Sequence, residues 1–301
     1  MNNYKNIFQL VSIPVLVALS WILGKVLIID LDPATLSSTR LLLSGSILLF
    51  FSNLTKQLLP MSYKERTKLL SIQILLSTIG RVTYFWLGTY ALVTISSSEA
   101  LIIMGLVPVF VLILEFLFKV NQLSTKKTLL ILSTCILSLT AITKESTSNS
   151  SYSDLSIGHL AALGAAVSFA LYLVLQKRFI NKSPPSNTLV IQFLFAGFVL
   201  FLIANSPIQK IINLNGVQLV RLITYSAICS LLPHFFLQRS LATFHSSTVS
   251  SVISFTPVIG IILTTIFEKK QINFSFLLLT LLACACCAIL LLSIRPKKES
   301  C

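Results

Sequence analysis

The chain has 301 residues, of which 55% are hydrophobic and only 11% are charged, and its mean hydropathy is +0.89. A soluble domain does not need so much apolar surface, whereas apolar stretches of about 20 residues cross membranes as helices. The formal net charge of +14 does not indicate nucleic-acid binding, because the basic residues lie in short segments between apolar runs and form no basic domain. We therefore expect a multi-pass integral membrane protein that lies in a lipid bilayer and binds no nucleic acid.

Ten apolar stretches are candidates for membrane-spanning helices, and together they predict an all-α protein. In chain order they are 8–29, 34–52, 69–92, 96–118, 128–143, 157–179, 188–204, 219–241, 248–267 and 274–293. The first is too long for the apolar region of a signal peptide and lacks a clear cleavage site, so we expect it to be retained. With the N-terminus placed inside, most of the 23 lysines and arginines fall in inside segments, which predicts that both termini are cytoplasmic.

One segment occurs twice, at 92–118 and at 241–267, with a shift of 149 and no gap. The matched residues include Pro108 and Pro257. Each half then holds five spans, and because five is odd the second half enters the membrane in the opposite direction. We expect a first five-helix repeat at 1–145, a Ser-rich outside linker at 146–156, a second repeat at 157–295 and a cytoplasmic tail at 296–301.

Several motifs occur in the same order in both halves. The first half has DPATLSSTRLLLSG at 32–45 and YFWLGTYALVTISSSEALIIMGLVPVFVLILEFLF at 84–118. The second has GHLAALGAAVSFALYLVLQKR at 158–178 and FFLQRSLATFHSSTVSSVISFTPVIGIILTTIFEKK at 235–270. In these motifs the chain resembles the EamA-type branch of the drug/metabolite transporter superfamily.

The resemblance implies a ten-helix transporter with inverted five-helix repeats and a central cavity lined by spans one, three, four, six, eight and nine. Relatives of this kind export amino acids and other metabolites or import scarce ones, including S-adenosylmethionine. It also implies a multi-pass protein of a bacterial inner membrane.

Charged residues inside a membrane are costly and mark functional sites by default. Arg81 lies about 18 Å along its span, near the middle of the bilayer, and its planar guanidinium suits a carboxylate or phosphate. A structural ion pair or a bond to backbone carbonyls is the alternative. Lys25 could contact substrate or reach to the outer interface. Arg40 begins its span, and a structural tie to the outer loop is the favoured reading.

Two residues are candidates for proton coupling. Glu99 opens span four in SSSEA, where it could also complement the positive end of the helix dipole. His234 lies within span eight and is matched by the repeat to Phe85; it could titrate or serve a structural hydrogen bond.

Aromatic and amide side chains complete the expected substrate site, with packing and interhelical hydrogen bonding as the alternative roles. Tyr84 follows Arg81 at i+3, and Tyr172 and Gln176 share a face at i,i+4. The expected substrate-binding residues are Trp21, Lys25, Arg81, Tyr84, Tyr90, Tyr172, Gln176, His234 and Gln238.

Pro108 and Pro257 should each bend a helix, because proline removes one backbone hydrogen bond. Their matched positions predict paired hinges or gates, while a static kink is the alternative.

The sequence therefore predicts a transporter that moves a small polar metabolite, an amino acid or a related compound with an acidic group, by alternating access. An S-adenosylmethionine or nucleotide-like substrate is the alternative within the superfamily, and a non-transporting scaffold or sensor is the alternative class. An enzyme is not expected, because the sequence has no HExxH, no GxSxG and no facing pair of aspartates. We expect no cofactor and no metal site, coupling to protons or exchange, and a monomer or homodimer.

Overall fold

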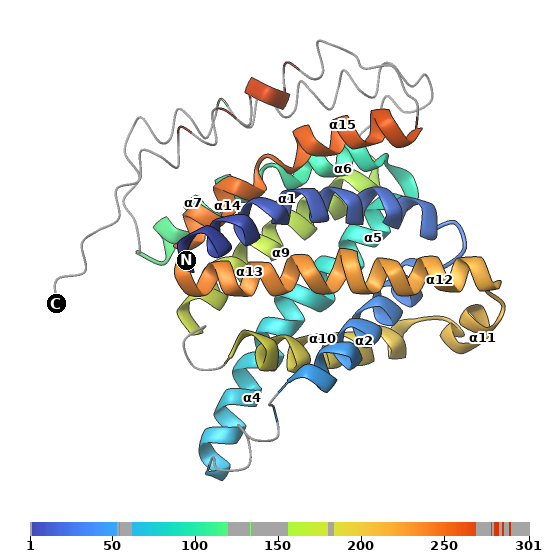
Figure 1. The fold of residues 1–301 in the computed structure, drawn as a ribbon, viewed down its shortest axis with the longest axis horizontal. Coiled ribbons are helices and arrows are strands. Elements are labelled where there is room, and N and C mark those ends of the chain that lie inside the picture. Colours follow the sequence, from blue (N-terminus) through green and yellow to red (C-terminus); the bar gives the residue numbers. More distant parts are fainter. Residues whose placement is uncertain are drawn as a thin grey trace.

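The computed structural model describes residues 2–52, 62–119, 156–179 and 184–268, together with isolated positions outside these ranges. The spans expected at 128–143 and 274–293 lie outside these ranges, as do the tail and nearly all of the linker. The described segments form helices that pack around a buried apolar core (Figure 1). Seven of these helices are long and apolar enough to cross a membrane.

The eight expected spans that fall within the described ranges are all helical. The helices are α1 (Asn2–Leu27), α2 (Pro33–Phe51), α4 (Tyr63–Ser77), η1 (Thr78–Thr83), α5 (Tyr84–Thr94), α6 (Ser97–Met104), α7 (Val107–Leu117), α9 (Ile157–Phe179), α10 (Pro185–Ile203), α11 (Pro207–Ile212), α12 (Gly216–Thr224), η3 (Tyr225–Leu231), α13 (Leu232–Thr243), α14 (Ser246–Ile253) and α15 (Thr256–Glu268).

The third span begins earlier than the apolar pattern predicts. α4, η1 and α5 form one continuous run of 32 residues, Tyr63–Thr94. It begins at a capping box, in which the Ser62 hydroxyl accepts from the Glu65 N–H and the Glu65 carboxylate accepts from the Ser62 N–H. Such a cap starts a helix in polar sequence, so hydrophobicity alone misplaced this boundary.

Both halves have a π-helical stretch in the middle of the corresponding long helix. η1 spans Thr78–Thr83, and η3 spans Tyr225–Leu231. The repeat shift of 149 places η1 opposite residues 227–232, so the two stretches overlap. π-helical turns leave backbone groups outside the regular ladder and are frequent at functional sites. Arg81 lies in η1, and Tyr225 begins η3.

The two matched prolines begin new helices. Gly105 and Leu106 form a turn between α6 and α7, and Pro108 occupies the first turn of α7. Residues 254 and 255 form the matching turn between α14 and α15, and Pro257 follows in the first turn of α15. The sequence predicted proline inside a bent helix, whereas both spans are broken two to three residues before the proline. Proline is tolerated in a first turn because its missing N–H has no partner there.

The helices α2 and α10 occupy matched positions in the two halves of the chain and pack against each other. A Cβ on Gly45 would lie 2.9 Å from Leu194 Cδ2, and a Cβ on Gly197 would lie 2.8 Å from Leu42 Cγ. Each glycine thus leaves room for a leucine of the other helix. Residue 42 contacts residue 197 and residue 45 contacts residue 194, so the residue numbers rise along α2 as they fall along α10. The matched helices α2 and α10 therefore pack side by side and antiparallel.

The helix bundle has two ends, each named here for one of its residues. The Asp32 end holds Asp32, Ile95 and Asn215, and the Lys177 end holds Tyr63, Lys177 and Thr243. At the Asp32 end, Lys210 in α11 donates to Asp32 Oδ1 at 2.7 Å. Asp32 also caps α2 by accepting from the Thr35 N–H. The pair therefore links α11, the short helix before α12, to the start of α2.

We expect Asp32→Asn to lower stability at neutral pH by less than about 1 kcal/mol, because partly exposed pairs contribute little and asparagine still caps a helix. Partial burial acts to raise the pKa of Asp32, but its hydrogen bonds from Lys210 and Thr35 outweigh that effect and lower the pKa. A carboxylate with a lowered pKa stabilises the fold above the ordinary carboxyl range, and this contribution is lost as the pH falls through the folded pKa.

The difference in melting temperature between wild type and Asp32→Asn should therefore shrink on acidification. Thermal melts of the purified proteins in detergent across pH measure it, with Asp30→Asn at the exposed neighbouring carboxylate as control. A difference that does not change with pH would contradict the ion-pair contribution.

Candidate functional site

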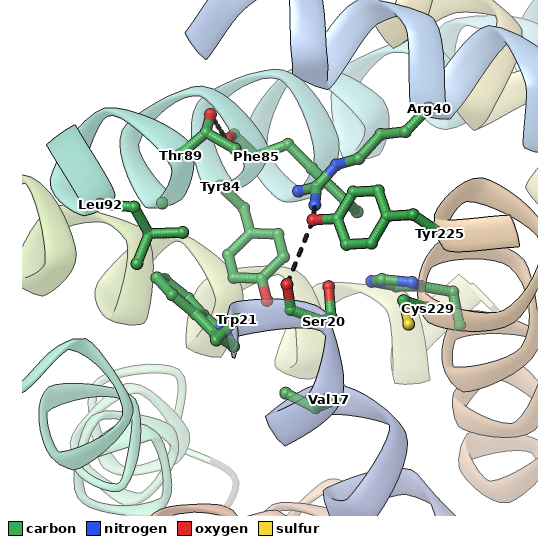
Figure 2. A pocket seen from close by; sticks show the side chains of 12 residues that line it. Val17, Ser20, Trp21, Arg40, Tyr84, Phe85, Thr89, Leu92, Tyr225 and Cys229 are labelled. Atoms are coloured by element: carbon green, nitrogen blue, oxygen red, sulfur yellow. Dashed lines mark hydrogen bonds between the residues drawn. The ribbon is translucent and has the colours of Figure 1, made fainter. Parts of the chain in front are cut away.

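A small cavity with aromatic walls lies between α1, α2, α5, η3 and α13 (Figure 2). Spans one, two, three and eight line this cavity. The resemblance implied spans one, three and eight, but it also implied spans four, six and nine, which do not line it, and it did not imply span two. Its lining includes Trp21, Arg40, Tyr84, Phe85 and Tyr225. Ser20, Thr89, Cys229 and His234 supply its other polar groups.

Arg40 is the charged residue of this cavity. Its Nη1 donates to the Tyr225 hydroxyl, and that hydroxyl donates to the Ser20 carbonyl at 3.2 Å (Figure 2). The guanidinium lies over the Phe85 ring, with 4.1 Å between Cζ and the ring centroid. Its Nε is buried without a hydrogen-bond partner. Among the described residues Arg40 has no carboxylate partner in an ion pair, so its charge is balanced only by a hydroxyl and ring faces.

The opposite wall of the cavity is built from Trp21 and Tyr84. Both side chains line the cavity, and the Tyr84 ring stacks on Phe169 at 4.8 Å between centroids. Gly88 lies against the Trp21 ring and leaves room for it, since an added Cβ would approach Trp21 to 3.1 Å. Three residues expected from the sequence, Trp21, Tyr84 and His234, line this one cavity.

The cavity is nearly closed in this conformation. The space open to the centres of water-sized molecules is about 20 Å³, and one water molecule needs about 10–15 Å³ of such space. A metabolite is far larger than one water molecule. Any substrate therefore requires the surrounding helices to separate.

His234 belongs to an aromatic layer at one edge of the cavity. Its ring centroid lies 5.1 Å from that of Phe85 and 5.7 Å from that of Phe193. Its Nδ1 is hydrogen-bonded to the Ser230 carbonyl at 2.7 Å, which fixes the ring. The residue that the repeat matches to Phe85 thus packs directly against Phe85.

Arg81 lies on the other side of this layer, in a separate polar cluster. Its Nη2 donates to the Tyr172 hydroxyl at 2.6 Å, and its guanidinium lies 4.5 Å from the Tyr172 ring centroid and 5.2 Å from that of Phe193. The side chain is completely buried. Gln176 and Gln238, which the sequence also singled out, bond to each other in this cluster at 3.1 Å.

Two lysines cap helix ends at opposite ends of the molecule. Lys25 Nζ donates to the carbonyls of Leu92 and Ile95 at the end of α5, the latter at 2.9 Å. Lys177 Nζ donates to the carbonyl of Leu241 near the end of α13 at 2.7 Å. Leu92 and Leu241 are matched by the repeat, so each half ties its first helix to the end of its long third helix. A lysine is favourable there because it meets the negative end of the helix dipole.

Glu99 caps the N-terminus of α6. Its carboxylate accepts from the Ser96 N–H and the Ser96 hydroxyl, both at 2.8 Å, and lies 3.8 Å from Nε2 of His159. Tyr90 lies on an exposed side of α5, with 40% of its surface accessible. Neither Glu99 nor Tyr90 is among the residues that line the cavity. Within the described ranges, no group of three or more His, Cys, Asp or Glu residues comes together to hold a metal ion.

Arg40 and Tyr225 both line the cavity, whereas the sequence favoured a structural tie for Arg40 and did not single out Tyr225. Arg40 lies seven residues after the first residue of α2, about 10 Å along the helix, so it is well inside the span. The rule that intramembrane charges are functional suspects would have found it. Tyr225 carried no such signal, because its partner Arg40 is 185 residues away in the sequence.

Comparisons with known proteins agree with this architecture. The model of the EamA-like transporter family matches residues 5–143 and 156–292, so the family unit occurs twice. A protein of Buchnera aphidicola subsp. Schizaphis graminum described as an uncharacterized transporter is 26% identical over 259 residues, which is 84% of this chain and 83% of its own.

A crystal structure of another protein superposes with a TM-score of 0.69 and covers 96% of this chain and 97% of its own. At 13% identity the likeness is one of fold. The two family matches extend over most of the chain, and the chain belongs to the EamA-like transporter family.

Proposed function

We propose that this membrane transporter moves a small metabolite that carries an acidic group, and that the acidic group binds to Arg40. The observation that carries the proposal is the unpaired guanidinium in the aromatic cavity. An arginine without a carboxylate partner in a buried site is costly, and an incoming carboxylate or phosphate would supply the missing charge through charge-assisted hydrogen bonds. The Nε that has no partner in this conformation is available for such a bond.

The cavity walls suit a flat or apolar body on the substrate. Trp21, Tyr84, Phe85 and Tyr225 present ring faces and edges, and aromatic pairs stabilise contact beyond simple burial. A carboxylate to hold a substrate cation is not among the residues that line this cavity. These features favour an acidic amino acid derivative or a nucleotide-like compound over a cationic metabolite.

Alternating access is the mechanism we propose. In this scheme the chain has ten spans in two inverted five-helix repeats, with both termini in the cytoplasm of a bacterial cell. The broken spans at Pro108 and Pro257 would act as matched hinges, and the lysine caps would hold the two ends closed in turn. The closed cavity supports this mechanism, because substrate can enter only when one end opens. His234 at the cavity edge and Glu99 at the start of α6 are the proposed coupling residues.

The test is exchange by purified wild-type protein in proteoliposomes, with matched pairs of compounds. The pairs are AMP and adenosine, phenylalanine and phenylalaninamide, and succinate and succinamide. We expect at least one acid to exchange about tenfold faster than its neutral partner, which corresponds to about 1.4 kcal/mol of preference. Equal exchange of acid and neutral partner in every active pair would overturn the acidic-group assignment. A folded protein that exchanges none of the six compounds would favour the non-transporting alternative.

A further inference from the structure

The side chains around Arg81 form a network of hydrogen bonds that, among the described residues, contains no carboxylate to balance the arginine charge. The Tyr172 hydroxyl donates to Gln192 Oε1 at 3.1 Å, and Gln192 Nε2 donates to Gln176 Oε1 at 3.0 Å. Gln176 in turn donates to Gln238, and Gln238 Nε2 donates back to the Tyr172 hydroxyl. Gln192 Nε2 also donates to Oε1 of buried Gln73 at 2.8 Å. These five side chains bond to one another and offer Arg81 no anionic acceptor.

Arg81 has unused donors as well as an unpaired charge. Among the described residues, its Nε and Nη1 are buried without hydrogen-bond partners, and Nη2 donates to Tyr172. Within the described part of the chain it forms no ion pair. Stacking on Tyr172 and Phe193 offsets part of the cost, but two orphaned guanidinium nitrogens are the mark of a site built for an oxyanion.

The repeat relates this cluster to the cavity. In α2 and α10 the sequences align with Pro33 on Pro185 and Gly45 on Gly197, which places Arg40 on Gln192. The reciprocal contacts of Gly45 with Leu194 and of Gly197 with Leu42 support this register. Gln192, a member of the Arg81 cluster, thus occupies the place in the second half that Arg40 occupies in the first.

The two arginines lie on opposite sides of one aromatic layer, and each is bonded to a tyrosine of the second half. Arg40 stacks on Phe85 and bonds to Tyr225, while Arg81 stacks on Phe193 and bonds to Tyr172. His234 contacts both phenylalanines, so the layer is continuous. Arg81 precedes Tyr84 by three residues along the long helix and so lies nearer to the Lys177 end.

We infer that Arg81 and Tyr172 form a second oxyanion-binding site, which takes the acidic group of the substrate when the protein opens toward the Lys177 end. The inference rests on the proposed function, in which Arg40 and Tyr225 bind the same group when the Asp32 end is open. Transport then passes a carboxylate or phosphate from one arginine–tyrosine pair to the other across the aromatic layer. Each pair is buried when its own end is closed.

Side-resolved thiol labelling tests the inference. Arg81→Cys and Arg40→Cys are each made in a full-length chain whose six native cysteines are replaced by alanine. A membrane-impermeant methanethiosulfonate is applied to oppositely oriented membrane vesicles, with AMP, phenylalanine or succinate as protectant. We expect Arg81→Cys to react from the Lys177 end only and Arg40→Cys from the Asp32 end only. The acid that wild type exchanges should slow both reactions by about fivefold or more, because it binds to the arginine that remains in each variant and favours the conformation in which the labelled end is closed. Its neutral partner should not slow them.

Failure of Arg81→Cys to react from either end, or reaction unaffected by the acid, would overturn the second site while leaving acid exchange by wild type intact. Exchange by Arg81→Lys provides the measurement that does not depend on the cysteine variants. We expect Arg81→Lys to raise the half-saturating acid concentration at the Lys177 end only, by about tenfold, because lysine cannot bind an oxyanion through two parallel bonds. An equal change at both ends, with a lowered melting temperature, would assign Arg81 a structural role.

Discussion

Exchange of the acidic substrate is expected to fall by about 100-fold in Arg40→Gln, because truncating one partner of a buried, hydrogen-bonded charge pair costs about 2–5 kcal/mol. The substitution removes the charge of the cavity and keeps a side chain that the fold accepts. Glutamine already stands at the matched position in α10, where Gln192 packs without exposure. The loss should therefore appear in exchange and leave the amount of folded protein unchanged.

Arg40→Lys separates charge from geometry. Lysine keeps the positive charge but cannot present two parallel N–H groups to a carboxylate, so we expect an intermediate loss of about tenfold. Arg221→Gln is the matched control, since Arg221 is an exposed arginine of α12. The measurement is initial exchange of AMP, phenylalanine and succinate in proteoliposomes. Exchange by Arg40→Gln at the rate of Arg221→Gln would remove Arg40 from the substrate site.

The sequence predicted the architecture better than it predicted the site, and the reason is physical. Membrane spans follow from about 20 apolar residues in a row, which is local information, so seven of the expected spans coincide with helices long and apolar enough to cross a membrane. Helix ends set by polar caps, as at Ser62, and π-helical turns, as at Thr78–Thr83, have no hydrophobic signature. These features needed the structure.

A charge within a span marks a candidate residue in the sequence, but the contact that a distant helix makes with it is not readable there. Arg81 and Tyr172 were both singled out, but their bond joins α9 to η1 across 91 residues. Spacing placed Arg81 and Tyr84 on one face, yet the structure assigns Arg81 to the glutamine cluster and Tyr84 to the cavity. Periodicity orders residues around one helix and carries no information about which neighbouring helix they meet.

Gly80→Ala is expected to produce the largest loss of stability of the variants considered, because the Tyr172 ring packs directly on the backbone of η1. An added Cβ would lie 2.0 Å from Tyr172 Cδ2, 2.3 Å from Cγ and 2.7 Å from Cβ. Rotation of the ring cannot relieve a clash that includes its own Cβ, so α9 must move or Tyr172 must leave its rotamer. Overpacking of this kind costs about 1–3 kcal/mol, and loss of a buried hydrogen bond adds about 1–3 kcal/mol.

The consequence of Gly80→Ala should extend from stability to exchange, because Tyr172 holds both Arg81 and the ring of glutamines. Gly216→Ala is the control: a Cβ there meets nothing within 4 Å, and a change within about 0.5 kcal/mol is expected. Melting temperatures of the purified proteins measure the difference. The Gly80→Ala effect should be much smaller when Tyr172 is already alanine, since the clashing partner is then absent. Two results would contradict this account: equal melting temperatures for Gly80→Ala and Gly216→Ala, or an equal loss of melting temperature from Gly80→Ala when Tyr172 is alanine. Either would show that close packing of Tyr172 on η1 does not stabilise the Arg81 cluster.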